Sequence, residues 1–255
     1  MLRNIYWWFL LLSTIPSIGQ AADAKMPVAN ETDYKYNWAR PGLNIRAADR
    51  IGAEKLGVIP FGVQVHIIED LKRSEYSVEV TAFFALTYSV NNSGMFLNGH
   101  WVKVSYNSIE GYVFDGFLST LPPMVWIDDD SGIKYLEGFG QYVERNFASD
   151  NSKSGGGNRL EAFEQKRVYD NGLIYEKRGK IGAFEEILII PNATLNEGEL
   201  VVLRMYNSEG MCLLNDQEKP QILVQLPEKF TVGWEAEEYE FYQFGSTLVM
   251  RVTRS

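Results

Sequence analysis

Residues 41–46 read Pro-Gly-Leu-Asn-Ile-Arg and residues 56–65 read Leu-Gly-Val-Ile-Pro-Phe-Gly-Val-Gln-Val, two short strand patterns bounded by Gly and Pro. Two more follow at 101–106, Trp-Val-Lys-Val-Ser-Tyr, and at 111–114, Gly-Tyr-Val-Phe. Apolar and polar residues alternate in the third pattern, as in a strand that buries one face, and Asn107 to Gly111 supply the turn before the fourth. The series predicts a hairpin from Trp101 to Phe114 within a small β-barrel that spans residues 34–122.

In this order, the patterns resemble those of the bacterial SH3-like (SH3b) domain, over about a third of the chain. The resemblance implies a binding module of the bacterial envelope. One departure is the segment from Glu69 to Gly99, which lies where the family usually has a short loop. Its many strand-forming residues predict an inserted hairpin rather than an irregular loop.

Aromatic side chains at the rim of such a barrel offer flat, rigid contact area, which suits short peptides, extended strands or sugar rings. The candidate ligand-binding residues are Tyr36, Trp38, Asn44, Arg46, Trp101, Tyr112 and Phe114. Two alternatives stay open. Trp101 and about half of the other aromatic residues could fill the barrel core instead, and Asn44 and Arg46, in the stretch that matches the family's Leu-Asn-Ile/Val-Arg motif, could hold a turn rather than a ligand carboxylate.

Residues 1–24 are typical of a cleaved export signal. Arg3 supplies a positive charge, Trp7 to Ile15 form an apolar run, and small residues between Ala21 and Ala24 offer a cleavage site. The run ends at Pro16, short of the roughly 20 residues that span a bilayer. We therefore expect a periplasmic or secreted protein with no stable membrane insertion after cleavage.

Pro122-Pro123 marks the predicted start of a second domain, residues 124–255. Helical spacing between Asp130 and Phe147 predicts one helix capped by the acids at 128–130, and Ser149 to Asn158 predict a flexible connector. Strands are predicted on both sides of the turn Asp170-Asn171-Gly172, and further along at 186–190, 200–206, 211–214, 222–226, 239–244 and 247–253. The predicted fold class is mainly β: an SH3-like barrel with an inserted hairpin, then an α+β domain with one helix and a mostly antiparallel sheet. We recognise no family in this second half.

The formal net charge of -9 argues against a nucleic-acid partner, whose phosphates require clustered Lys and Arg. Bacterial SH3-like domains often accompany cell-wall peptidases with a Cys–His pair. The only cysteine, Cys212, lies in an apolar run, however, and the only histidines, His66 and His100, lie in the barrel. The acids from Asp128 resemble part of a calcium loop, but no bidentate Glu follows at the required distance, and helix capping explains them more simply.

No catalytic residue, metal site or cofactor is therefore predicted. We expect an exported, non-catalytic binding protein whose partner is cell-wall peptide or an envelope protein. An envelope hydrolase with an unrecognised site in the second domain, or a structural or assembly protein, is the alternative.

Overall fold

The computed structural model describes residues 34–70, 75–79, 96–128, 134–147, 163–180, 182–206, 221–234 and 236–254. The predicted export signal, the connector at 149–158 and the strand around Cys212 lie outside the described residues. Neither helix in the described part of the chain is long and apolar enough to cross a membrane.

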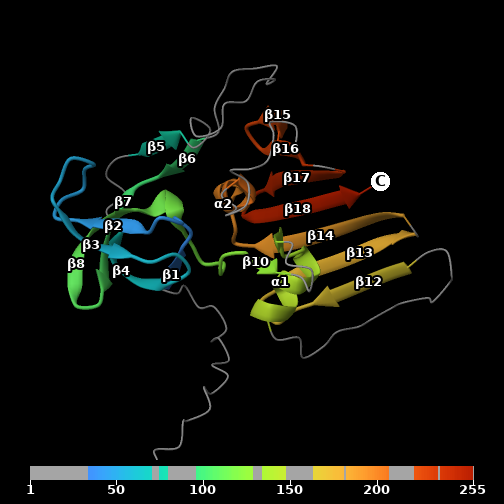
Figure 1. Cartoon of the computed structure of the whole chain (residues 1–255), viewed down its shortest axis with the longest axis horizontal. Helices are drawn as coiled ribbons and strands as arrows, with labels where there is room; N and C mark the ends of the chain where they lie inside the picture. The colour runs from blue at the N-terminus through green and yellow to red at the C-terminus, as the bar shows by residue number, and fades with distance from the viewer. Residues whose placement is uncertain are drawn as a thin grey trace, which may run out of the picture.

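Seven short antiparallel strands form the N-terminal barrel, in the spatial order β3-β2-β8-β7-β4-β1-β9 (Figure 1). The strands are β1 Tyr34–Asn37, β2 Leu43–Arg46, β3 Lys55–Ile59, β4 Gln64–Asp70, β7 Trp101–Tyr106, β8 Ile109–Phe114 and β9 Leu118–Ser119, with the 3-10 helix η2 at Asp115–Phe117. The predicted hairpin is confirmed, since β7 and β8 pair from Trp101 opposite Phe114 to Tyr106 opposite Ile109. Its turn is only Asn107 and Ser108, both with positive φ, the turn type that matches the twist of a hairpin.

Side chains that alternate along the strands point inward and fill the interior of the barrel. The buried apolar residues are Ala39, Leu43, Ile45, Ile59, Val65, Val102, Val104, Val113 and Leu118. Two polar residues of the barrel are buried as well, Ser119 and Asn37, and Asn37 is fully buried. Its Nδ2 donates to the carbonyls of Ile59 (2.8 Å) and Pro60 (3.1 Å), and its Oδ1 accepts from the N–H of Ala39 (2.8 Å). Asn37 therefore fastens β1 to the segment that follows β3.

The long insertion after β4 begins and ends in paired strands. Strand β5, Tyr76–Glu79, runs antiparallel to β6, Phe96–Gly99, with Tyr76 opposite Gly99 and Glu79 opposite Phe96. This pairing agrees with the predicted hairpin at the base of the insertion. Residues 80–95 lie outside the described part.

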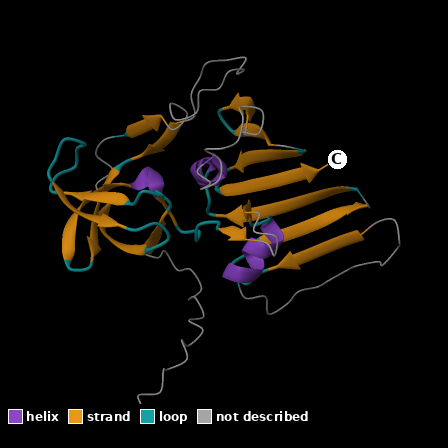
Figure 2. Ribbon diagram, in the orientation of Figure 1, coloured by secondary structure: helices purple, strands orange, loops and turns teal. Residues whose placement is uncertain are grey.

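The second half is built on another seven-stranded antiparallel sheet, in the order β12-β13-β14-β18-β17-β16-β15 (Figure 2). Its strands are β12 Phe163–Val168, β13 Ile174–Lys180, β14 Ala183–Pro191, β15 Gln221–Leu226, β16 Lys229–Trp234, β17 Glu237–Phe244 and β18 Thr247–Arg254. A small hairpin of β10 Trp126–Asp128 and β11 Lys134–Leu136 precedes it. The mainly β fold class is thus confirmed, as is the turn at 170–172, where Gly172 has a φ of +80°.

The helix predicted from Asp130 to Phe147 is wrong in its first half. Leu136 pairs with Trp126 and Tyr135 with Ile127 in the β10–β11 hairpin, and Asp128 lies in β10 rather than at a helix N-terminus. Helix α1 spans only Phe139–Asn146, after Gly138. The reason is that a strand pairing satisfies these backbone groups as well as a helix does, and Gly138 disfavours helix continuation.

Residues 200–206, predicted as a strand, belong instead to a second helix, α2, Leu195–Tyr206. Its N-terminus is capped by Thr194, whose backbone N–H donates to Glu197 Oε2 at 2.9 Å. Thr194 and Glu197 form the Thr-x-x-Glu pattern of a capping box, a signal that the sequence carries and that identifies this helix. Four apolar residues within 200–205 are buried, because the helix lies between barrel and sheet.

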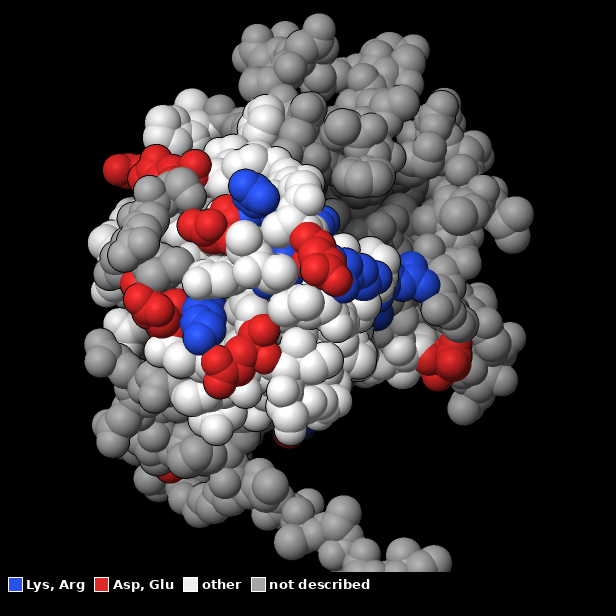
Figure 3. All heavy atoms as spheres, turned by 90° about the vertical axis from the view of Figure 1, so that its left-hand side faces the viewer, with Lys and Arg blue, Asp and Glu red and all other residues white. Residues whose placement is uncertain are grey.

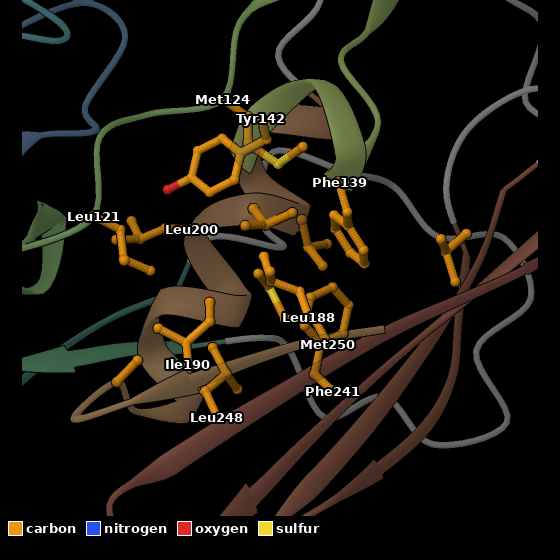
Figure 4. Close-up of a cluster of buried hydrophobic side chains, with 14 of the residues drawn as sticks. Leu121, Met124, Phe139, Tyr142, Leu188, Ile190, Leu200, Phe241, Leu248 and Met250 are labelled. Carbon is orange, nitrogen blue, oxygen red and sulfur yellow. The ribbon is translucent and has the colours of Figure 1, made fainter. Parts of the chain in front are cut away.

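A single apolar cluster joins the two halves of the molecule. Trp38 and Phe114 of the barrel and Leu97 of the inserted hairpin belong to the same cluster as the residues labelled in Figure 4, which come from the linker, both helices and the sheet. Both helices lie on one face of the sheet: Gly140 of α1 approaches Tyr175 and Gly198 of α2 approaches Phe241, and both rings lie in one cross-strand row. The segment Pro122-Pro123 is buried, and its carbonyls accept hydrogen bonds from Tyr142 and Arg145.

Replacing Asn37 with alanine should lower the free energy of unfolding by about 2–3 kcal/mol, because two carbonyls and one N–H lose their partner inside the barrel. Urea denaturation measures the change. The control is Gln64→Ala, which alters an exposed amide on the neighbouring strand β4. Equal stability of the two variants would contradict the role assigned to Asn37.

Burial raises the pKa of Glu199 in α2 to about 8, against an ordinary value of 4.5. Between those values the unfolded chain is ionised while the folded protein keeps the proton, so stability falls as pH rises from 4.5 to 8 and then levels off. Glu199→Gln should abolish this decline and stabilise the protein at pH 8, by as much as about 4–5 kcal/mol, because each unit of pKa shift corresponds to about 1.4 kcal/mol. Urea denaturation at several pH values tests it, and an unchanged pH profile would refute it.

Candidate functional site

The barrel presents a row of polar side chains that crosses four neighbouring strands. In β2, Leu43 and Ile45 are buried while Asn44 and Arg46 point outward. Arg46 lies directly opposite Tyr112, Tyr112 opposite Lys103, and Lys103 opposite Glu69. We call Arg46, Tyr112, Lys103 and Glu69 the outer row; Asn44 lies beside it on the same face of β2.

The outer row combines both signs of charge with one phenol ring. Lys103 Nζ lies 3.0 Å from Glu110 Oε2, and this hydrogen bond, together with the charge of Glu110 and more weakly that of Glu69, raises the pKa of Lys103. Arg46 donates one N–H to the carbonyl of Ala53 at 2.9 Å, which anchors the guanidinium within the β2–β3 hairpin. Acidic and basic side chains lie side by side on this end of the molecule rather than in a patch of one sign (Figure 3).

Three of the candidate ligand-binding residues lie in the interior. Trp38, Trp101 and Phe114 are only 4%, 7% and 5% exposed. Trp38 donates from Nε1 to the carbonyl of Leu121 at 2.9 Å, and the ring of Phe114 contacts those of Tyr76 and Phe117 edge to face. In this conformation their rings are not open to a ligand, and Trp38 and Phe114 belong to the cluster that joins barrel and sheet rather than to the interior of the barrel.

Tyr36 holds an intermediate position. Its ring is half-buried and packs against the cluster that joins barrel and sheet, and burial raises the pKa of its hydroxyl. The structure therefore brings Asn44, Arg46 and Tyr112 together on one outward face and turns Tyr36 toward the second half of the chain. Sequence analysis missed Lys103 and Glu69, although the alternation along 101–106 already places Lys103 outside.

A Ser–His neighbour pair on the barrel surface is relevant to catalysis. Ser105 lies opposite His66 and also opposite Glu110. In the described part of the chain no hydrogen bond joins Ser105 to His66. Glu110 pairs with Lys103, and the His66 ring lies against that of Tyr34, with the ring centres 4.8 Å apart and the planes tilted by 36°. The arrangement lacks the nucleophile–base–carboxylate order that activates a serine.

Metal-ligating side chains do not gather in the residues that the structure covers: no group of three or more His, Cys, Asp and Glu is placed to hold an ion there. His100, the second histidine, lies at the start of β7. Its backbone N–H donates to Asp115 Oδ1 at 2.6 Å.

Residues 41–119 match the family model of the bacterial SH3 domain. The N-terminal part of this chain therefore contains a bacterial SH3-like domain, as the resemblance predicted. The match runs from the turn before β2 to the last residue of β9, so β1 lies outside it, although β1 pairs with both β4 and β9. No curated protein and no solved structure matched the chain.

Proposed function

We propose that this chain is an exported, non-catalytic binding protein of the bacterial envelope, and that its SH3-like domain recognises cell-wall peptide or a partner protein through the outer row. Bacterial SH3 domains commonly bind peptidoglycan or proteins, and the family match supports a binding role of this kind. The observation that carries the proposal is the position of Arg46, Tyr112 and Lys103 in one register across three strands.

The chemistry of the outer row suits a short peptide of mixed charge. Directly opposite residues in a sheet have Cβ atoms about 5 Å apart, so the row offers closely spaced partners along an extended chain. Arg46 and Lys103 can donate hydrogen bonds to a carboxylate, Glu69 can accept them from an amine, and the Tyr112 ring supplies flat contact area. Cell-wall stem peptides carry free carboxylates together with an amino group, which is the combination that this surface requires.

The export signal predicted at residues 1–24 supports a location outside the cytoplasm, where such peptides are found. The non-catalytic part of the proposal is supported by the pairing of Glu110 with Lys103, because this neighbouring carboxylate is then engaged by a cation instead of orienting the His66 imidazole. The partner of this domain is thus bound and released rather than cleaved.

Tyr112→Ala and Arg46→Ala should each weaken binding of glycan-free stem peptide by about tenfold, the effect expected for a residue central to an interface. Isothermal titration calorimetry with the mature chain measures it. Phe244→Ala serves as the control, because Phe244 is 66% exposed and lies in the second sheet, far along the chain from the barrel.

Binding that is equal in all variants would exclude the outer row as the site. If the unmutated protein binds no stem peptide, cell-wall peptide is excluded and a partner protein is the remaining ligand. Release of soluble fragments from purified sacculi, measured in parallel, would contradict the non-catalytic role.

A further inference from the structure

The two helices leave part of the inner face of the second sheet uncovered. The row Leu188–Met250–Phe241 lies beneath the helices and is fully buried (Figure 4). Two further rows continue on the same face, Glu186–Val252–Tyr239 and then Phe184–Arg254–Glu237. These rows form the floor of a cavity of about 410 Å³.

The walls of this cavity come from the small hairpin and from the start of α1. Trp126 of β10, Tyr135 and Leu136 of β11, and Gly138 and Phe139 at the helix start all line it. Its volume falls within the range of small-molecule sites, about 300–1,000 Å³. The cavity thus borders the β10–β11 hairpin, whose second strand occupies part of the segment that the sequence predicted as the first half of a helix.

The carboxylates in the cavity are each neutralised by a cation. The pairs are Glu137 with Arg145 (Oε2 to Nε, 2.9 Å), Glu186 with Lys177 (2.6 Å) and Glu237 with Arg254. Three negative charges thus face three positive ones, and the local net charge is zero. A polycation would meet the repulsion of the three cations and an anion that of the three carboxylates, so neither is the favoured ligand.

Aromatic side chains supply much of the remaining lining, together with Met124, Leu136 and Val252. The face of Phe184 lies 4.8 Å from Lys177 Nζ and 5.2 Å from Arg254 Cζ, which fixes the orientation of the ring. The Tyr135 ring is 38% exposed, and Tyr239 donates its hydroxyl hydrogen to Glu237. Aromatic rings, carboxylate acceptors and a guanidinium donor thus line the same cavity.

We propose that this cavity binds a neutral saccharide of one or two pyranose rings. The C–H faces of a sugar ring pack against aromatic side chains, while its hydroxyls donate to the carboxylates of Glu186 and Glu237 and accept from Arg254. Uncharged groups with many hydroxyls satisfy this lining without disturbing its ion pairs. The inference depends on the cavity alone and not on peptide binding by the barrel.

The test uses the mature protein with three peptide-free probes: the disaccharide of N-acetylglucosamine, cellobiose and maltose. Saturation-transfer NMR and calorimetry should show saturable binding of at least one at millimolar concentration, and the choice between the first probe and the other two identifies an amino sugar or a plain hexose. Tyr135→Ala and Arg254→Gln should each weaken that binding at least about fivefold. Phe244→Ala, on the opposite face of the same sheet, should leave it unchanged.

Absence of binding for all three saccharides would overturn the proposal, as would saccharide binding that Tyr135→Ala and Arg254→Gln leave unaltered. Tighter binding of inorganic phosphate or of spermine than of any saccharide would also overturn it, since the charge balance predicts the reverse. Tyr135 and Arg254 are partly exposed, and urea denaturation of each variant verifies that it is folded. Because the probes contain no peptide, failure here leaves the outer row and its ligand untouched.

Discussion

Burial of Trp38 and Phe114 in one cluster with Tyr142, Leu200 and Phe241 is the interaction on which the arrangement of this protein depends. The cluster draws on the barrel, the linker, both helices and the second sheet. Directed hydrogen bonds reinforce it: the Tyr142 hydroxyl donates to Pro122 and Arg204 Nε donates to Met124, each at 3.0 Å. Arg204 also lies over the ring of Phe61 in the barrel, 4.8 Å from its centre. The barrel therefore has an apolar interior of its own and in addition shares a second core with the sheet.

The shared core decides which surfaces remain for ligands. Trp38 and Phe114 of the barrel are buried against other parts of the same chain. A ligand that binds the barrel surface would therefore contact the polar outer row around Tyr112. On the second sheet the same core uses the middle of the inner face and leaves the strand ends around Glu186 and Arg254 open to a cavity. One packing constraint thus accounts for both candidate binding surfaces and for their different chemistry.

The sequence alone was sufficient to predict those parts of the fold that depend only on residues close together in the chain. The hairpin from Trp101 to Phe114 and the turn at Gly172 follow from alternation and from residues that tolerate positive φ, which neighbours in the chain specify. The helix errors have a different origin: residues 200–206 are apolar enough for a buried strand or a buried helix, and only the capping pair at Thr194 separates the two. For the site, alternation in β2 was enough to place Asn44 and Arg46 outside. Nothing local distinguishes buried Trp38 from half-buried Tyr112, because most residues of the cluster that buries Trp38 follow Pro122 in the chain.

Hydrogen exchange followed by mass spectrometry in increasing urea tests the shared core most directly. If barrel and sheet unfold as one unit, backbone amides in β7 and β8 and those in β14 and β18 lose protection at the same urea concentration. Loss of protection in the barrel strands at a lower urea concentration, while the central strands of the second sheet stay protected, would contradict the account.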